Sequence, residues 1–544
     1  MAGGLAGAFP QKIVLDSQFT IHNSPFITSP VSSEDSTRKN LASDTAILVY
    51  LSIATLLGYC LVSGQYGYFR DELYHLACGE HLDWGYVDQP PFVALVAFLS
   101  RRVLGESLLA VRFAPALAES LVVLLTGLIA RELGGGKFAQ ALAALAFIIG
   151  PVYLSIGHIL SMNAFDHLFW ALAVYVLVLI LKHDRPRLWV VFGLIAGAGL
   201  MNKYSVGFLG VGLVVGLALT PARKYFLNRW LWVGGALAFL IFLPHIVWEI
   251  QDGFPTREFI HNATVRKNLP MSPLAFLAES GLQVHPVTFP IWLAGLYFCF
   301  FSSLGKSFRV LGWIYVAVLG LFLLTNAKPY YLAPAVPMLL AAGAVEFESL
   351  IRARQWNWLK PTYTTALVLG GLVTLPYALP VLPIETFIRY EDFIGLHPGS
   401  GERGQSGKLP QMYADMFGWE NQVATVAKVY NALSPQEKAR TIIFCSNYGQ
   451  AGAIDFFGKK YGLPQARSGH NNYWYWGAGN WDADMVITVG ESREDVEKTF
   501  SQVDLGATVV SEYARPSETD LPIYIGRKPK MSLREVWPRC KDFI

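Results

Sequence analysis

The stretch Tyr66-Gly-Tyr-Phe-Arg-Asp-Glu-Leu-Tyr-His75, with Asp83-Trp-Gly-Tyr-Val-Asp-Gln-Pro-Pro91 close behind it, follows the first long apolar segment, Ala46 to Val62. Asp71 and Glu72 therefore stand where a membrane helix is predicted to end, and Asp88 lies in the same loop. Ionisable side chains at membrane depth are costly unless they serve a site. The pattern predicts an acid/base or metal-binding cluster at a membrane surface.

The composition around this stretch is that of a polytopic membrane protein. Of the 544 residues, 53% are hydrophobic and only 15% are charged, whereas soluble domains carry about 25% charged residues. A net charge of +3 gives no support to nucleic-acid binding. The five cysteines are scattered without a CxxC pair, so they give no zinc or redox signature.

The apolar windows predict about eleven spans, because roughly 20 apolar residues cross a bilayer. The candidates are 46–63, 111–130, 138–156, 164–181, 189–202, 205–220, 230–249, 286–302, 310–326, 331–346 and 362–382. The apolar helix 91–104 ends in two arginines, which favours a re-entrant or interfacial helix.

Three regions follow from this pattern. Residues 1–45 are predicted to be a disordered tail, and residues 46–382 a transmembrane domain with a catalytic outer loop over 64–110. Residues 383–544 are polar and carry three apolar runs that predict strands, at Thr441–Ser446, Asp484–Gly490 and Leu521–Gly526. Helical spacing over 451–461 completes the pattern of a small α/β domain.

The distribution of basic residues among the loops predicts the orientation of the chain in the membrane. With the N-terminal tail inside, most short basic loops fall inside, and the loop with Asp71 and the 383–544 domain fall outside. Lys203 and Lys328 also fall outside, as do the basic residues of 257–267. They are either ordinary loop charges or the contacts of an anionic ligand. Lys203 is the sharpest case, since its turn between two apolar spans is very short.

Three carboxylates, Asp71, Glu72 and Asp166, are candidates for catalysis. Asp71 is the predicted general base, since a partly desolvated carboxylate gains basicity. Glu72 is also a catalytic candidate, but it points to another face of any regular element. Asp166 lies in an apolar run near the outer start of the fourth span, where a charge is expensive. The alternative for Asp71 is a helix N-cap or a partner for Arg70, and the alternative for Asp166 is a helix N-cap.

Other residues offer weaker ligand patterns. Asp88 with His261 or His285 could bind a divalent cation, although two ligands far apart in sequence are weak evidence and a solvated histidine is the alternative. Lys328 and Tyr331 precede a late span, where they either bind a phosphate or serve as interfacial anchors. The run Asn471-Asn-Tyr-Trp-Tyr-Trp-Gly477 faces a sugar or lipid, or packs against the membrane domain.

These residues resemble the polyprenyl-phosphate-dependent glycosyltransferases of the GT-C class, and within it family 39, which includes protein O-mannosyltransferases, lipid A aminoarabinose transferases and Rgt-type galacturonosyltransferases. The resemblance rests on Asp71-Glu72 after the first span, on Gly85 to Pro91, on Asp166 and on Lys328 to Tyr331. It implies an α-helical membrane protein of GT-C type with a small C-terminal α/β domain. It also implies inverting transfer of a sugar from a polyprenyl phosphate to a lipid, glycan or protein.

The resemblance also implies roles for single residues. Asp71 matches the family's loop base and Asp166 its second acidic position. Lys203, Lys328, Tyr331 and Tyr86 are the expected contacts of the donor phosphate, and Asp88 stands at the family's metal-binding glutamate. Gln89 and Tyr74 stand where aminoarabinose transferases carry a lysine and an arginine, so positive charge is lost at this point. No cofactor beyond a divalent metal is implied.

The implied location is the inner membrane of a bacterium, with the site on the outer side. A multi-pass transporter or lipid flippase is the alternative, and a purely structural membrane protein is a third. Transporters tend to show repeated halves with charges at the midplane, whereas here no repeat is visible and the charges gather at one face.

Overall fold

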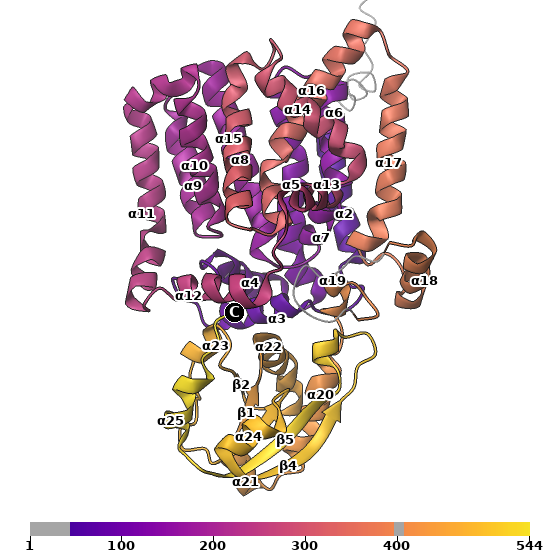
Figure 1. The fold of residues 1–544 in the computed structure, drawn as a ribbon. Coiled ribbons are helices and arrows are strands. Elements are labelled where there is room, and N and C mark those ends of the chain that lie inside the picture. Colours follow the sequence, from indigo (N-terminus) through magenta and orange to yellow (C-terminus); the bar gives the residue numbers. More distant parts are fainter. Residues whose placement is uncertain (1–43, 397–406) are drawn as a thin grey trace, which may run out of the picture. The chain divides into compact units, whose positions relative to one another are not determined.

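The computed structural model describes residues 44–396 and 407–544, and Asp44–Ile544 form one compact unit. The predicted tail over 1–45 lies almost entirely outside the described residues. Within them, the apolar segments form a bundle of helices, and a smaller domain with a β-sheet follows it in sequence (Figure 1). The expected combination of an α-helical membrane domain with a C-terminal α/β domain is therefore confirmed.

The bundle contains long, bent and short apolar helices. The long ones are α2 (Asp44–Val62), α5 (Leu108–Glu132), α8 (Met162–His183), α11 (Arg229–Gln251) and α15 (Arg309–Leu324), the last preceded by η4 (Lys306–Phe308). The bent pairs are α6 (Lys137–Ile148) with α7 (Pro151–Gly157), α10 (Ser205–Ala218) with η1 (Pro221–Leu227), and η5 (Pro329–Ala335) with α16 (Pro337–Arg354). The others are α9 (Leu188–Leu200), η3 (Pro286–Thr288), α14 (Phe289–Phe300) and α17 (Leu359–Ala378).

The predicted count of about eleven spans is not confirmed. Among the described residues, five helices are long and apolar enough to cross a membrane, or up to eight if each bent pair is one span. Proline accounts for the breaks, since Pro151, Pro221 and Pro337 each open the second helix of a pair and proline cannot donate the backbone hydrogen bond that would continue the first. Each of the eleven predicted segments nonetheless falls on a helix.

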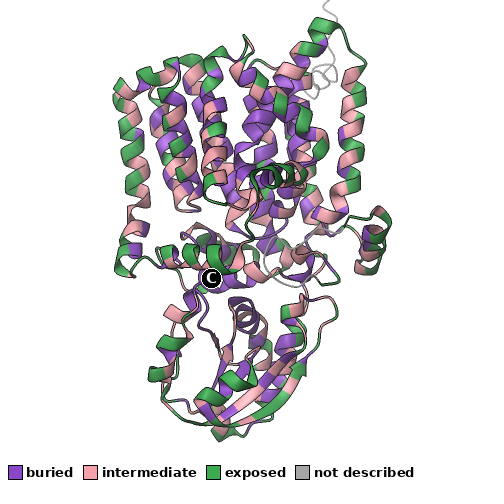
Figure 2. Cartoon of the chain, viewed as in Figure 1, coloured by how far each residue is buried: buried purple, intermediate pink, exposed green. Residues whose placement is uncertain are grey.

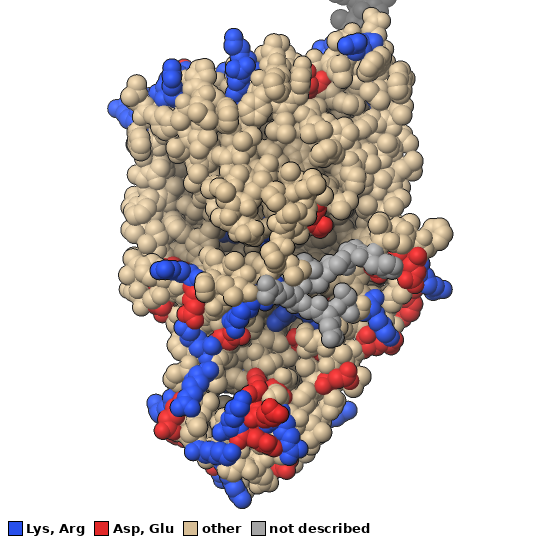
Figure 3. Space-filling view, in the orientation of Figure 1, with Lys and Arg blue, Asp and Glu red and all other residues tan. Residues whose placement is uncertain are grey.

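The outer faces of the bundle are apolar and exposed, as a lipid-facing surface requires. Leu240, Val214 and Leu369 are each more than half exposed, and Figure 2 shows exposed and half-buried residues along the outward sides of α11 and α17, with buried residues between the helices. Basic side chains gather at the end of the bundle away from the C-terminal domain, and a largely uncharged band separates the two (Figure 3). The ion pair of Lys182 with Glu132 lies between two of the loops predicted to be inside.

The predicted outer loop is built largely from two short helices, α3 (Arg70–Glu80) and α4 (Phe92–Leu104). Together with α12 (Pro255–Asn262) they form a layer between the bundle and the C-terminal domain (Figure 1). Helix α4 buries Val93 and Ala97 while Leu99 is exposed. This amphipathic helix matches the predicted interfacial helix over 91–104. The π-helical turn η2 (Ala263–Lys267) and α13 (Pro273–Val284) lead back into the bundle.

The C-terminal domain contains a five-stranded sheet in the order β2-β1-β3-β5-β4. Its strands are β1 (Thr441–Cys445), β2 (Ala466–Arg467), β3 (Met485–Val489), β4 (Phe500–Val509) and β5 (Leu521–Pro529). Its helices are α18 (Ile384–Ile394), α19 (Gln411–Ala414), α20 (Trp419–Asn431), α21 (Pro435–Ala439), α22 (Tyr448–Phe457), η6 (Gly458–Tyr461), α23 (Asn472–Tyr475), α24 (Arg493–Thr499), η7 (Pro516–Glu518), α25 (Leu533–Val536) and η8 (Trp537–Cys540). The three predicted strands are confirmed, whereas β2 and β4 were not predicted, because one is very short and the other is mostly exposed.

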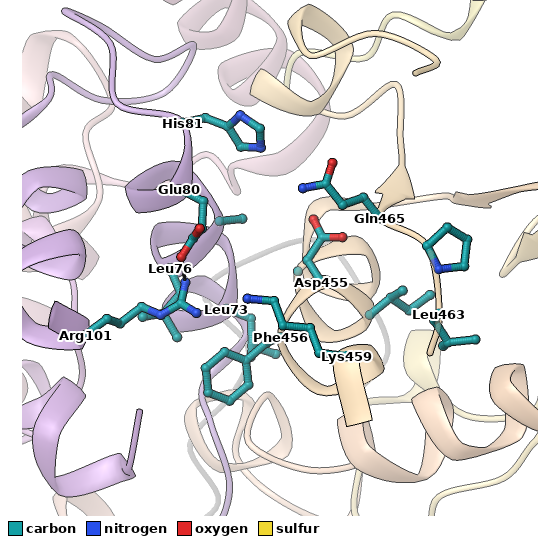
Figure 4. Close-up of a pocket in the computed structure, with 14 residues that line it drawn as sticks. Leu73, Leu76, Glu80, His81, Arg101, Asp455, Phe456, Lys459, Leu463 and Gln465 are labelled. Atoms are coloured by element: carbon teal, nitrogen blue, oxygen red, sulfur yellow. Dashed lines mark hydrogen bonds and ion pairs between the residues drawn. The ribbon is translucent and has the colours of Figure 1, made fainter. Parts of the chain in front are cut away.

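The sheet domain packs against the outer loop through α22, which lies along α3. Gly452 allows this contact, since an added Cβ there would lie 2.9 Å from the backbone of Leu73. A cavity of about 70 Å³ remains at one edge of the contact. In Figure 4, Glu80 and Arg101 lie on one side of it and Asp455 and Lys459 on the other. The loop and the sheet domain therefore form one packed assembly.

Candidate functional site

Asp71 lies at the start of α3 and is held by a residue of the C-terminal domain. Its Oδ1 accepts a hydrogen bond from the Tyr448 hydroxyl at 2.8 Å. The Arg70 guanidinium lies 4.6 Å from the centre of the same tyrosine ring. Burial and the nearby Asp71 carboxylate raise the pKa of Tyr448 well above its ordinary value, so this hydroxyl remains a donor. The half-buried Asp71 carboxylate is thus fixed in orientation and keeps its second oxygen for another partner.

Glu72 has a different environment, although it is the next residue. It is fully buried, and its carboxylate accepts hydrogen bonds from Arg112 Nε at 2.9 Å and Arg112 Nη2 at 2.8 Å. The backbone amides of Phe69 and Leu160 donate to it at 2.8 Å and 2.9 Å. Every acceptor position of this carboxylate is occupied. We therefore assign Glu72 a structural role in place of the predicted catalytic one, because no reacting group can reach it.

The second carboxylate cluster lies where α8 begins beside the short turn before α10. Asp166 is 1% exposed, its Oδ1 accepts a hydrogen bond from the Ser205 hydroxyl, and its Oδ2 lies 3.6 Å from Lys203 Nζ. Lys203 also donates to Asn163 Oδ1 at 2.6 Å. Its ammonium group lies 4.8 Å from the ring centre of Tyr331. The predicted residues Asp166, Lys203 and Tyr331 are therefore brought together from three separate segments.

The first loop reaches this second cluster directly. The Phe92 amide donates to the Met201 carbonyl at 3.0 Å, and the Phe92 ring lies 5.4 Å from that of Phe165. The end of the Asp83–Pro91 segment thus touches both the turn that carries Lys203 and the helix that carries Asp166. The segments that carry Asp71, Asp166 and Lys203 therefore meet at one end of the bundle. The space-filling view shows a hollow in the bundle above the C-terminal domain (Figure 3).

Asp88 faces Tyr74 across the loop. The Tyr74 hydroxyl donates to Asp88 Oδ1 at 2.9 Å. Burial raises the pKa of Asp88 to about 7, and the hydrogen bond from Tyr74 opposes that shift. The nearby Asp71 carboxylate raises it further. Tyr74, which replaces a basic residue in the family pattern, therefore binds the carboxylate instead of a phosphate.

The raised pKa of Asp88 predicts that the stability of the folded chain depends on pH. The folded chain holds the Asp88 proton up to about pH 7, whereas the unfolded chain loses it near the ordinary pKa of 3.8. The contribution of Asp88 to stability therefore falls as the pH rises between these two values. In the Asp88→Asn variant, the thermal unfolding midpoint should decline less between pH 5 and pH 8 than in the parent chain. Scanning fluorimetry in nanodiscs measures this, with the exposed Asp504→Asn as control. Equal slopes for Asp88→Asn and the parent chain would contradict it.

The predicted metal pair does not form a site. Among the residues that the structure describes, no group of three or more His, Cys, Asp or Glu side chains could hold a metal ion. His261 is exposed on α12, and His285 accepts a hydrogen bond from the Val287 amide instead of facing Asp88. The residues present do not fit a metal, so we derive no catalytic step through one.

The other two predicted phosphate contacts, Tyr86 and Lys328, lie in different surroundings. Tyr86 is fully buried, and its hydroxyl lies 3.1 Å from the Cys78 carbonyl and 3.0 Å from the His81 carbonyl. This hydroxyl shapes the loop and cannot reach a ligand, so we assign it a structural role. Lys328 caps the turn η5, which carries Tyr331.

The sequence missed the contribution of the C-terminal domain. Besides Tyr448, Asn472 supplies an Oδ1 that accepts a hydrogen bond from the Val87 amide at 2.6 Å. The Trp476 ring stacks on His81 at 4.3 Å. The aromatic run 471–477 therefore packs against the outer loop, which was one of its two interpretations. Its density of amide and aromatic side chains was the only signal, and Tyr448 gave none.

The comparisons with known proteins agree with this arrangement. Residues 88–248 match the family model described as dolichyl-phosphate-mannose-protein mannosyltransferase. No curated protein matches the chain. The fold is similar to that of ArnT from Cupriavidus metallidurans bound to undecaprenyl phosphate, with a TM-score of 0.55 and 15% identity over 88% of this chain and 97% of that one. The apo state of the same protein gives a TM-score of 0.55 and 14% identity, with the same coverage.

The family model favours a glycosyltransferase over a transporter or flippase, and the likeness to ArnT shows the fold. The fold expected from Asp71-Glu72, Asp166 and Lys328 to Tyr331 is confirmed along most of the chain. The chain therefore has the fold of the GT-C glycosyltransferases, and its residues 88–248 carry the sequence pattern of the dolichyl-phosphate-mannose-protein mannosyltransferase family.

Proposed function

We propose that this chain is an inverting glycosyltransferase that moves a sugar from a polyprenyl phosphate to a hydroxyl of a lipid, glycan or protein. The observation that carries the proposal is the position of Lys203, whose ammonium lies 3.6 Å from Asp166 Oδ2 and 4.8 Å from the centre of the Tyr331 ring. A cation held by a carboxylate and facing an aromatic ring suits a phosphate at the end of a lipid tail. The similar ArnT structure contains undecaprenyl phosphate, which supports this donor class.

The chemistry follows from the two carboxylate clusters. The acceptor hydroxyl attacks the anomeric carbon from the face opposite the phosphate, and its proton passes to Asp71 as the C–O bond forms. The bond between the anomeric carbon and the phosphate oxygen breaks, and the electron pair leaves with the polyprenyl phosphate. Lys203 stabilises the negative charge that develops there. Asp166 holds Lys203 in place, and Tyr448 orients Asp71.

We also propose that the site lies on the outer side of a bacterial inner membrane. Basic side chains concentrate at the opposite end of the bundle (Figure 3), which is the end that the positive-inside rule assigns to the cytoplasm. The donor tail then enters from the bilayer beside the exposed apolar helices.

The proposal is tested by transfer from a defined donor. The purified full-length chain in nanodiscs is mixed with undecaprenyl phosphates that carry single radiolabelled sugars, and with an envelope extract from cells that lack the protein. Label should pass into a lipid, glycan or protein that mass spectrometry identifies. Transbilayer movement of donor without any transfer would instead support a flippase.

Lys203→Gln should lower kcat by about 100-fold, as the loss of one preorganised charge donor does in other enzymes. The turn is preserved while the charge is removed, because the backbone amides of Asn202 and Lys203 hold it by donating to the Gly199 carbonyl. The measurement is the rate of transfer at saturating donor. Lys498→Gln, in an exposed ion pair with Asp495, is the matched control and should leave the rate within about twofold. A Lys203→Gln rate equal to that of the control would refute the phosphate role.

Tyr448→Phe should lower kcat about tenfold, since a hydrogen bond to a charged group contributes roughly 1.5–3 kcal/mol. KM for the lipid donor should stay nearly constant, because this hydroxyl positions Asp71 and is not assigned any contact with the donor. Tyr513→Phe removes a hydroxyl that donates to Glu385 Oε1 at 3.4 Å in an exposed contact, and serves as the control. A fall in stability with unchanged kcat per folded molecule would show that Tyr448 is merely structural.

A further inference from the structure

The sheet of the C-terminal domain has a point at which the strand order reverses. Strands β2, β1 and β3 are parallel neighbours, and β1 lies between the other two (Figure 1). From β1 the chain passes through α22 to β2 on one side, and then through α23 to β3 on the other. In sheets of this kind, ligands bind beyond the carboxyl ends of the strands at the reversal point.

A cavity of about 310 Å³ lies at this point. Ser446 follows β1, His470 follows β2, and Thr488 and Glu491 stand at the end of β3, and all four line the cavity. Helix α24 and the segment α25–η8 supply further walls. The volume is at the lower end of the range for small-molecule pockets, roughly 300–1,000 Å³. The cavity is separate from the Asp71 and Lys203 clusters and has no part in the proposed transfer.

The cavity contains polar atoms whose hydrogen bonds are not made within the protein. Thr488 Oγ1 and His470 Nδ1 are buried and have no partner, in residues that are 4% and 6% exposed. At least nine in ten buried polar groups in proteins are paired. Glu491, half-buried at the same end, forms no hydrogen bond or ion pair with any residue that the structure describes. Three residues that line the cavity thus carry polar atoms whose hydrogen bonds are not made within the described protein.

Much of the remaining lining is apolar. Phe444, Val486, Phe500 and Trp537 line the cavity from the sheet and from η8. A ligand that fits must carry hydroxyls for Thr488, His470 and the Glu491 carboxylate, together with an apolar face for the rings. A sugar ring has both properties, because its C–H face packs on aromatic rings while its hydroxyls hydrogen bond.

The charged side chains that line the cavity indicate which sugars it can bind. The carboxylates of Glu491, Asp495 and Asp542 line the cavity with the single guanidinium of Arg539. Asp495 pairs with Lys498, and Asp542 pairs with Arg266. Glu491 and Arg539 are in no ion pair among the described residues. Glu491 stands with Thr488 at the end of β3, whereas Arg539 lies on η8, so a uronic carboxylate at the strand ends is repelled while a neutral or amino sugar is accepted.

We propose that the C-terminal domain holds a carbohydrate-binding site for a short neutral or amino saccharide in this cavity, between Thr488, His470, Glu491 and the apolar wall of Phe444 and Trp537. The site stands behind the catalytic loop. The His470 ring packs against Tyr448 with centroids 4.7 Å apart, and Tyr448 binds Asp71. A sugar that contacts His470 would therefore touch a ring that packs directly against Tyr448, the residue that orients Asp71.

The test is saturation-transfer NMR on the full-length chain in nanodiscs, which avoids glycoside detergents. The probes are glucose, galactose, N-acetylglucosamine, glucosamine and galacturonate, each alone. Ring protons of at least one neutral or amino sugar should receive saturation, and galacturonate should bind at least tenfold more weakly. Thr488→Val, which removes only the hydroxyl, and Glu491→Gln should each weaken binding about tenfold. Thr508→Val, on an exposed position of β4, should bind as the parent chain does.

Asp71→Asn separates this site from the proposed transfer site, because it should retain sugar binding even though transfer is lost. The proposal is overturned if no probe receives saturation from the parent chain. It is also overturned if binding is unchanged in both Thr488→Val and Glu491→Gln, or if it disappears in Asp71→Asn. Glu491→Gln lies at a half-buried position, so it keeps the test decisive if Thr488→Val does not fold.

Discussion

Asp71→Asn is expected to lower kcat by about 10²–10⁴-fold, the range that loss of a general base covers, without unfolding the chain. Asparagine has nearly the same shape, and its carbonyl oxygen can still accept the hydrogen bond from Tyr448 that Asp71 accepts at 2.8 Å. What disappears is the capacity to take the acceptor's proton. The measurement is sugar transfer from undecaprenyl-phosphate donors, normalised to folded protein from its thermal unfolding midpoint.

The matched control is Asp504→Asn, which removes a half-exposed carboxylate paired with Arg527 in the C-terminal domain. It should retain transfer within about twofold. If folded Asp71→Asn keeps more than half of the parent rate, Asp71 is not the base. If the parent chain itself transfers no sugar, a transporter or a structural protein is favoured. A loss of activity together with a lower unfolding midpoint would point to packing at α3 instead.

Arg112→Met should destabilise the chain by about 3–5 kcal/mol, the usual result of removing one partner of a buried ion pair. Both side chains are almost completely buried, and methionine leaves the Glu72 carboxylate without its two guanidinium contacts. It also leaves the carbonyls of Ser63 and Gly67 without the donors that Arg112 supplies. The thermal unfolding midpoint in nanodiscs should fall steeply, and expression with it.

The double variant Glu72→Gln with Arg112→Met should recover part of this loss, since the uncompensated charge is gone. Arg493→Met, which breaks an exposed pair with Glu497, should cost less than about 1 kcal/mol. A small effect of Arg112→Met, equal to that of Arg493→Met, would show that Glu72 can be solvated and would reopen a catalytic role for it.

The adjacent pair Asp71 and Glu72 shows where sequence reasoning ends. Their position after the first apolar segment predicted a functional loop, and their different faces predicted different surroundings. Which residue is available for chemistry depends on Arg112, 40 positions away, and on Tyr448, 377 positions away. Such contacts between distant segments leave no periodic signal, because hydrophobic spacing reports only which face of an element is buried.

The second cluster was easier to anticipate. A charge inside an apolar segment needs a partner, which singled out Asp166 and Lys203 before either was placed, and they lie 3.6 Å apart. The predicted Asp88–His pairing does not form. Asp88 is desolvated and does have a partner, but that partner is the Tyr74 hydroxyl on α3, which no sequence pattern singled out. His261 is exposed and needs no partner, and His285 is hydrogen bonded within its own turn.

The amino-acid sequence by itself determined that this is a helical membrane protein, that its carboxylates and outer lysines belong to one side, and that a small α/β domain follows. Hydropathy, basic loops and the alternation of apolar runs encode these features locally. Only the tertiary structure decided that Glu72 is locked to Arg112, that Tyr448 closes on Asp71, and that the parallel strands end around an unfilled polar cavity. The two hydrogen-bonded contacts join positions 40 and 377 residues apart, and the cavity depends on how the strands and helices pack. Such geometry is set only once the whole chain has packed.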